Sequence, residues 1–205
     1  MSLNKSQCPL YESNIKYSLC DILIHNLDII IIGFNPGVVS SIIGHHYAGK
    51  NHFWHCLYQA HLIPEKLNAT DELKALSYGI GFTNIVQRTT ITSGNLTKDE
   101  LKSGAKLLLE KIIFYKPKIA VFNGIGIYKS FSQKKAFNLG KQPEIVGNTS
   151  VIYVMPSSSA RCSQLPRLQD KLKYFVTLKK LLDYIKGYNI EIDPNVDFIF
   201  PNINA

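Results

Sequence analysis

DIIIIGFNPG, at residues 28–37, is the stretch from which the fold can be worked out. Four consecutive isoleucines are followed at once by the turn sequence GFNPG, residues 33–37. A short apolar run that ends in turn residues is typical of a buried strand that stops abruptly. In an open parallel sheet, ligands bind beyond the carboxyl ends of the strands. The stretch therefore predicts that the amide side chain of Asn35 lies at a ligand-binding edge.

Two further buried strands are predicted at residues 118–123 (KIAVFN) and 151–155 (VIYVM), and residues 78–88 are also rich in β-formers. The predicted helices are a local one at 17–26 and longer ones at 53–62, 70–77, 98–115, 126–132 and 166–187, with a capping box at Thr97–Glu100 and a C-cap glycine at Gly187. Alternation of buried strands and helices predicts a parallel sheet with helices on both faces. The turns GFNPG, NGIG and MPSSSAR should then share one edge of the sheet and form one composite site.

The chain length of 205 residues suits one domain, and the hydrophobic fraction of 45% suits a sizeable core. We expect a lead-in at 1–19, a folded domain at 20–187 and an acidic tail at 188–205, which could pack or be disordered. Residues 133–149 read as a polar loop with a possible edge strand. Without a membrane-length apolar run or a signal-peptide pattern, we expect a soluble, intracellular protein.

The charge is unevenly distributed along the chain. The formal net charge is +8, yet the tail at 188–205 contains Glu191, Asp193 and Asp197 and no Lys or Arg. The other 187 residues carry 23 basic and 12 acidic side chains, a formal charge of +11. A basic body suits a polyanionic partner such as nucleic acid. Charge alone is equally compatible with a basic protein that binds no polyanion.

The sequence also contains partial matches to a phosphate loop, a metal site and a catalytic serine. GHHYAGK, residues 44–50, matches a phosphate loop except that Asn51 stands where a magnesium-binding Ser or Thr belongs. His45, His46, His52 and His55 fall within eleven residues, but no Cys or acidic residue accompanies them within the loop, so they are expected to be solvated or hydrogen-bonded. The serines of MPSSSAR lack the flanking glycines of a nucleophile elbow and suit phosphate binding better. The four cysteines form no CxxC pair and are expected to be reduced thiols, not metal ligands.

Asn35 suggests a different chemistry. A carboxamide is not a strong general base, but it can hold a water molecule and aim it. This suits a reaction with a cationic transition state, such as loss of a base from a deoxyribose. Taken alone, an Asn before Pro is more often a turn residue.

Five motifs occur in a recognisable order: GFNPG, GHHYAGKNHFW, YGIGFTNIVQRTT, KIAVFNG and VMPSSSARCSQLPRLQDK. Together they resemble the mismatch-specific thymine/uracil DNA glycosylases of the eukaryotic thymine-DNA glycosylase type, within the uracil-DNA glycosylase superfamily. The resemblance spans about residues 20–187. It implies an α/β fold, a three-layer αβα sandwich with a central, mostly parallel four-stranded sheet, in which residues 20–187 are the catalytic domain.

The resemblance implies a role for each residue that matches a motif. Asn35 would position the attacking water at the sugar C1′, Asn84 would hydrogen-bond the flipped base, and Arg161 would enter the duplex where the base left. The remaining assignments are a base pocket of Phe34, Gly37, Ser40, His46, Tyr47 and Asn51, phosphate contacts from Asn123, Ser157 and Ser159, and contacts to the orphaned guanine from Ala160, Gln164 and Pro166.

The implied activity is that of a monofunctional DNA glycosylase in base excision repair. It would flip and excise thymine or uracil, or formyl- or carboxylcytosine, mispaired with guanine, and leave an abasic site. No metal or organic cofactor is expected, and no lysine lies in GFNPG or MPSSSAR for Schiff-base chemistry. The implied partners are double-stranded DNA with G·T or G·U mispairs and downstream abasic-site repair enzymes, for a monomer in the nucleus.

Ser40 departs from the family pattern, in which an alanine faces the pyrimidine 5-position. Its hydroxyl could bond a polar 5-substituent or crowd a methyl group. Two alternatives of other classes stay open from the sequence: a non-catalytic module that binds mismatched or modified DNA, and a nucleotide-binding hydrolase.

Overall fold

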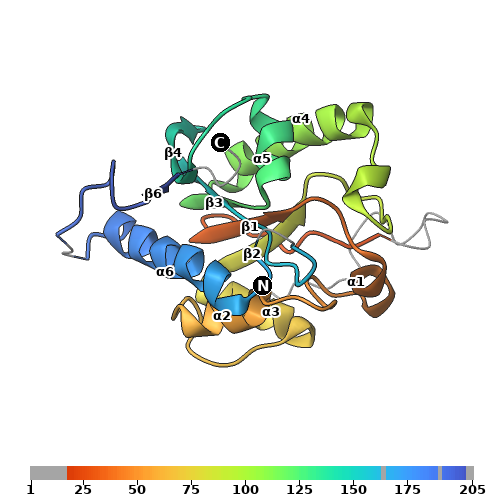
Figure 1. The fold of residues 1–205 in the computed structure, drawn as a ribbon, viewed down its shortest axis with the longest axis horizontal. Coiled ribbons are helices and arrows are strands. Elements are labelled where there is room, and N and C mark those ends of the chain that lie inside the picture. The colour runs from red at the N-terminus through yellow and green to blue at the C-terminus, as the bar shows by residue number, and fades with distance from the viewer. Residues whose placement is uncertain (1–17, 163–164, 189–190, 202–205) are drawn as a thin grey trace.

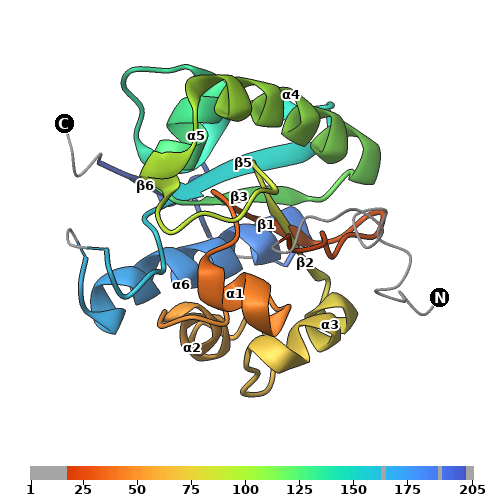
Figure 2. The ribbon, with the colours of Figure 1, turned by 90° about the vertical axis from the view of Figure 1, so that its right-hand side faces the viewer.

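The computed structural model describes residues 18–162, 165–188 and 191–201. Within these ranges a mixed sheet lies between two layers of helices (Figures 1 and 2). The strands are β1 (Ile29–Gly33), β2 (Ile80–Asn84), β3 (Ile119–Asn123), β4 (Leu139–Val146), β5 (Ser150–Met155) and β6 (Ile199–Phe200). The α-helices are α1 (Val38–Ile43), α2 (Phe53–Gln59), α3 (Glu72–Ala75), α4 (Lys98–Tyr115), α5 (Ile125–Ser132) and α6 (Leu168–Ile185), and short 3₁₀ turns are η3 (Ala69–Asp71), η4 (Leu76–Tyr78) and η5 (Ser93–Asn95).

The strand order within the described residues is β2-β1-β3-β5-β4-β6. The first four strands run parallel, β4 runs antiparallel to β5, and β6 runs antiparallel to β4. The predicted four-stranded sheet is therefore wrong in its strand number. Strands buried on both faces are continuous apolar runs, whereas β4 (LGKQPEIV) is half exposed and polar. It lies within residues 133–149, which were predicted as a polar loop with a possible edge strand.

The helices form two layers that cover opposite faces of the sheet (Figure 2). Helices α4 and α5 lie on one face, and α1, α2, α3 and α6 lie on the other. The predicted capping box of α4 is confirmed, because Thr97 Oγ1 accepts from Glu100 N and the Glu100 carboxylate accepts from Thr97 N. No helix in the described ranges has both the length and the apolar character needed to span a bilayer.

The local helix predicted at 17–26 is wrong for the residues described. This segment is extended, with isolated bridges from Ser18 to Arg88 and from Ile22 to Phe82. The Ile22 backbone exchanges two hydrogen bonds with Phe82 of β2, at 2.8 and 2.9 Å. Pairing with the otherwise open edge of β2 satisfies backbone groups that a helix would satisfy internally, so tertiary contacts override the local pattern.

The described part of the acidic tail packs against the far edge of the sheet. Phe198 is fully buried, and its carbonyl accepts a 2.8 Å hydrogen bond from Lys141 N. Gly140 makes this approach possible: its φ is +84°, and a Cβ atom there would overlap the Phe198 carbonyl oxygen. Glycine adopts this conformation without the cost that other residues incur.

We predict that Gly140→Ala destabilises the protein more than Gly187→Ala. Both glycines have positive φ, so each alanine incurs a left-handed backbone cost of about 1–2 kcal/mol. Open space surrounds Gly187, whereas at Gly140 the overlap with Phe198 adds an overpacking cost of about 1–3 kcal/mol. Thermal unfolding of both variants measures the difference. Equal losses of Tm would show that the tail is not held where the structure places it.

Candidate active site

Four parallel strands bring polar side chains to one edge of the sheet. Asn84 ends β2, Asn123 ends β3, Asn35 follows β1 by two residues, and Ser157 follows β5 by two residues. All four line one cavity of about 660 Å³. The predicted composite site of three strand-end turns is therefore present, and β2 adds a fourth side. The predicted residues that line this cavity are Phe34, Asn35, Gly37, Ser40, His46, Tyr47, Asn51, Asn84, Asn123, Ser157 and Ser159.

The carboxamide of Asn35 is held by its nitrogen. Nδ2 donates to the Arg88 carbonyl at 2.8 Å and to Thr90 Oγ1 at 2.7 Å, and Thr90 in turn donates to the Thr92 carbonyl at 2.7 Å. Both amide hydrogens are used in this way. Among the described residues nothing donates to Oδ1, so this oxygen is left as an acceptor for a water molecule.

Arg88 is itself fixed, although it was not among the predicted site residues. Its guanidinium bonds Glu100 at the start of α4 and the Asn95 carbonyl, at 2.6–3.1 Å. The hydrogen bond from Arg88 and then that from the Thr97 amide lower the pKa of Glu100 to about 2. The carbonyl that orients Asn35 therefore belongs to Arg88, whose side chain is anchored to Glu100 and to the Asn95 carbonyl. Thr90 was also not predicted as a site residue. The sequence indicates it only by its position, six residues after Asn84.

Some residues that line the cavity carry buried polar atoms without hydrogen-bond partners. Asn84 is 6% exposed, and its Nδ2 has no hydrogen-bond partner among the described residues. Its Oδ1 lies so close to Gly33 that a Cβ atom there would overlap it. The Tyr47 ring stacks on Phe53 with a centroid distance of 3.9 Å, and burial raises the pKa of its hydroxyl, outweighing the opposite effect of the nearby Asn123 side chain. Desolvated polar groups without partners are costly, so they mark a surface that fits a polar ligand.

His45 and His46 share a carboxylate that no motif indicated. Nδ1 of His45 lies 2.9 Å from one oxygen of Glu72, and Nδ1 of His46 lies 3.0 Å from the other. The His46 ring stacks on Phe82 with a centroid distance of 5.5 Å. The expectation of hydrogen-bonded loop histidines is confirmed for this pair. The partner was missed because Glu72 belongs to a separate helix.

Ser40 and Asn51 brace the loop between α1 and α2. Ser40 Oγ accepts from Ala48 N at 3.2 Å and keeps its own proton free to donate. Asn51 donates to the Tyr47 carbonyl at 2.7 Å and accepts from Phe53 N at 2.9 Å. Both residues line the cavity and also set the path of the loop that carries His46.

The serine loop after β5 is pinned to the end of β3. Asn123 Nδ2 donates to Ser158 Oγ at 2.8 Å, and Ser158 N donates back to Asn123 Oδ1 at 3.0 Å. Ser157 Oγ accepts from Ser159 N, and Ser159 Oγ accepts from Arg161 N, each at 3.2 Å. These acceptors leave the hydroxyl protons of Ser157 and Ser159 available. The predicted phosphate contact of Asn123 stays a prediction, since the structure shows its amide engaged with Ser158.

Lys171, which sequence reasoning missed, supports the serine loop from below. It is 1% exposed, and Nζ donates to the Ser159 carbonyl at 2.7 Å and to His52 Nδ1 at 3.1 Å. Among the described residues it forms no ion pair with a carboxylate, and burial lowers the pKa of Lys171. Burial first, and then the charge of Lys171, lower the pKa of His52. A buried cation therefore lies directly beneath the loop predicted to contact phosphates.

Three of the predicted duplex-contacting residues are not among those that line the cavity. Ala160, Arg161 and Pro166 are exposed, and the Arg161 guanidinium makes no ion pair with any residue the structure describes. Gln164 falls outside the described residues.

Within the described ranges no group of three or more His, Cys, Asp or Glu residues could hold a metal ion. Cys56 and Cys162 are free thiols, but Cys20 is disulfide-bonded, so the expectation of four reduced thiols is wrong at Cys20. Motif spacing does not show which thiols meet in space.

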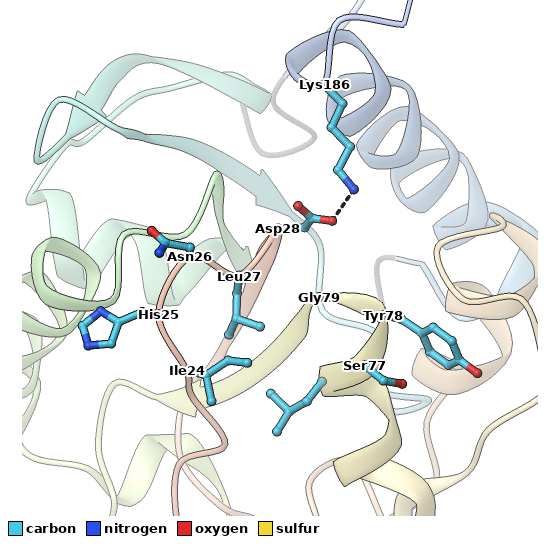
Figure 3. Close-up of a pocket in the computed structure, with 10 residues that line it drawn as sticks. Ile24, His25, Asn26, Leu27, Asp28, Ser77, Tyr78, Gly79 and Lys186 are labelled. Atoms are coloured by element: carbon cyan, nitrogen blue, oxygen red, sulfur yellow. Dashed lines mark hydrogen bonds and ion pairs between the residues drawn. The ribbon is translucent and has the colours of Figure 1, made fainter. Parts of the chain in front are cut away.

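A second cavity, of about 480 Å³, lies at the opposite edge of the sheet (Figure 3). Asp28, just before β1, forms ion pairs there with Lys118 and Lys186. Burial raises the pKa of Asp28, but these two lysines outweigh it, so the pKa lies below its ordinary value. This edge carries the amino ends of the parallel strands and none of the predicted site residues. We therefore assign the candidate site to the larger cavity.

We predict that Lys171→Met loosens the serine loop with little change in global stability. Methionine leaves the Ser159 carbonyl without its donor, at a cost of about 1–3 kcal/mol, but it also removes a buried charge that no carboxylate compensates. Hydrogen exchange of amides in residues 157–162 should therefore accelerate, while Tm changes by only a few degrees. Lys173→Met, at an exposed position on the same helix, is the matched control. Unchanged exchange in the loop would contradict the anchoring role.

Comparison with known proteins agrees with this geometry. A profile of the family described as the Uracil DNA glycosylase superfamily matches residues 21–181. A protein of Schizosaccharomyces pombe, named G/U mismatch-specific uracil DNA glycosylase, is 35% identical over 154 residues. The match covers 70% of this chain and 47% of the relative, so the chain spans about half the relative's length. The resemblance drawn from the five motifs is thus confirmed at the level of the superfamily, and the chain belongs to the uracil DNA glycosylase superfamily.

Proposed function

We propose that this protein is a DNA glycosylase that removes uracil mispaired with guanine by hydrolysing the N-glycosidic bond. The observation that carries the proposal is the Asn35 carboxamide, held through both amide hydrogens with Oδ1 free, at the mouth of a cavity lined by unpartnered polar groups. Membership of the superfamily and the similarity to the fission-yeast G/U mismatch-specific uracil DNA glycosylase support the same activity.

In the proposed reaction Asn35 orients a water molecule and does not act as a base. As the C1′–N1 bond breaks, its electron pair leaves on the base and the sugar acquires cationic character. A water molecule bound to Asn35 Oδ1 then adds its oxygen to C1′ and loses a proton to solvent. An oxocarbenium-like centre reacts with a weak nucleophile, so a group that aims the water suffices where a strong base is absent.

The base must leave the duplex to reach the cavity. Flipping costs a few kcal/mol and costs least for a mispaired base, which contributes to mismatch selectivity. Arg161, exposed and unpaired beside the cavity, is suited to fill the vacated space. The hydroxyls of Ser157 and Ser159 and the net charge of +8 suit phosphate contacts and counterion release.

The proposal extends to thymine and to formyl- and carboxylcytosine opposite guanine. Ser40 supports the oxidised cytosines, since its hydroxyl accepts from Ala48 N and keeps a proton for an acceptor on the base. We further propose a monofunctional, monomeric enzyme in the nucleus that hands its abasic product to downstream repair enzymes. Contacts of Ala160, Gln164 and Pro166 with the orphaned guanine belong to the same proposal.

We predict that Asn35→Ala abolishes excision from a G·U duplex while leaving duplex binding intact, because the side chain acts on water and not on DNA. Thr90→Val should lower the single-turnover rate by about tenfold, since one of the two hydrogen bonds that orient Asn35 is lost. Alkali cleavage of a labelled duplex gives the rate. Thr149→Val, at an exposed turn between β4 and β5 and outside the cavity lining, is the control.

Wild-type cleavage by Asn35→Ala would refute the mechanism. An intact duplex after incubation with the wild-type protein would instead favour a non-catalytic module that binds mismatches.

We predict that Arg161→Ala slows excision more in a duplex than in single-stranded DNA. Its expected contribution is to offset the stacking lost when the base flips, and a single strand has little stacking to replace. Single-turnover rates on both substrates measure the ratio. Arg167→Ala, an exposed arginine already paired with Asp170, is the matched control. The same fractional loss on both substrates would exclude a gap-filling role for Arg161.

A further inference from the structure

Glu72 is a fully buried carboxylate that bonds two residues of the loop that lines the cavity. It is 0% exposed, at the first position of α3, and its oxygens face the Nδ1 atoms of His45 and His46. It also accepts from His46 N at 2.6 Å. His46 is therefore held at its backbone and at its ring by one carboxylate oxygen.

This arrangement determines where His46 carries its proton. An ionised carboxylate only accepts hydrogen bonds, so when Glu72 is ionised the facing Nδ1 is the protonated ring nitrogen. In the neutral imidazole the other nitrogen, Nε2, then has a lone pair and acts as an acceptor. Stacking on Phe82 fixes the plane of the ring as well.

Nε2 of His46 has no partner in the described protein although the residue is only 3% exposed. His46 lines the cavity together with Asn84, whose Nδ2 is a buried donor that also lacks a partner. This unsatisfied acceptor and this unsatisfied donor belong to two residues that line the same cavity, and together they would complement a ligand edge that offers a donor beside an acceptor.

We propose that Glu72 is a positioning residue that fixes His46 with its proton on Nδ1, so that Nε2 accepts a hydrogen bond from N3–H of the flipped base. The inference rests on the proposed function only in taking the cavity to hold a pyrimidine. Uracil and thymine offer N3–H next to a carbonyl oxygen, which suits Nε2 of His46 and Nδ2 of Asn84. Cytosine offers a lone pair at N3 and an amino group next to it, which oppose both protein atoms.

The pair therefore selects against normal cytosine, the base that a glycosylase acting opposite guanine must leave in place. A site built to hydrogen-bond a group rejects an analogue that lacks it, because its buried polar atoms are left unpaired. In this proposal Glu72 does not touch the base. It makes Nε2 of His46, the atom that contacts the base, a hydrogen-bond acceptor.

The first test needs no substrate. In protein labelled with ¹⁵N-histidine, the nitrogen shifts and long-range couplings report which ring nitrogen carries the proton. We expect His46 to show a protonated Nδ1 and an Nε2 with a free lone pair. A proton on Nε2, in either the neutral or the charged ring, overturns the proposal.

The second test measures base preference by binding. The probes are duplexes with 2′-fluoroarabino-uracil or 2′-fluoroarabino-cytosine, which resist cleavage, each opposite an abasic site so that base pairing does not contribute. His46→Phe keeps a flat ring against Phe82 and removes both nitrogens. It should reduce the preference for uracil over cytosine by about tenfold, the size of one hydrogen bond.

Variants of Glu72 separate positioning from stability. Glu72→Gln keeps an oxygen facing His46 and should retain the preference, whereas Glu72→Met removes the acceptor and should lose it as His46→Phe does. Glu144→Met is the matched control: Glu144 is a part-buried carboxylate of β4, remote from the loop that carries His46, and it pairs with Lys134 and Tyr128. If Glu72→Met does not fold, His46→Phe and the tautomer measurement decide.

An unchanged uracil preference in His46→Phe overturns the inference even if the wild-type protein excises uracil. Conversely, a protein that cuts no G·U duplex refutes the proposed function, while the tautomer of His46 remains a separate result.

Discussion

The site depends on the pairing of β1 with β2, because that pairing joins the two halves of the Asn35 arrangement. Asn35 follows β1, and the two acceptors that orient it, the Arg88 carbonyl and Thr90 Oγ1, follow β2. The register Gly33↔Asn84 brings these strand ends level, and glycine at position 33 leaves room for the Asn84 amide. A shift in this register would separate Asn35 from the groups that orient it and displace the Asn84 amide as well.

Buried polar side chains anchor two of the loops that line the cavity. Glu72 binds the loop that carries His46, and Lys171 binds the serine loop through the Ser159 carbonyl. Both groups are desolvated, and burying a charge is costly unless hydrogen bonds compensate it. That cost is consistent with preorganisation of a site whose groups must be in place before the base arrives. At the amino ends of the parallel strands, by contrast, Asp28 is paired with Lys118 and Lys186.

Prediction from the sequence succeeded where the signal was local or periodic. The apolar runs at 28–33, 118–123 and 151–155 are strands, the Thr97–Glu100 capping box opens α4, and Gly187 ends the last helix in the left-handed conformation. It failed where long-range pairing decided the conformation. Within residues 18–26, Ile22 pairs with Phe82 of β2 and Ser18 with Arg88 where a helix was predicted, and the polar strand β4 pairs with β5 and β6.

The sequence by itself determined that polar turns follow apolar strands, and hence that Asn35, Asn123 and the serine loop share one edge, because parallel strands place their carboxyl ends together. Only the tertiary structure decided which side chains are supported and by what. Glu72 lies 26 residues from His46, Lys171 lies 119 residues from His52, and Thr90 lies 55 residues from Asn35. Hydrogen bonds between residues so far apart in the chain leave no periodic or local trace, so composition and spacing cannot reveal them.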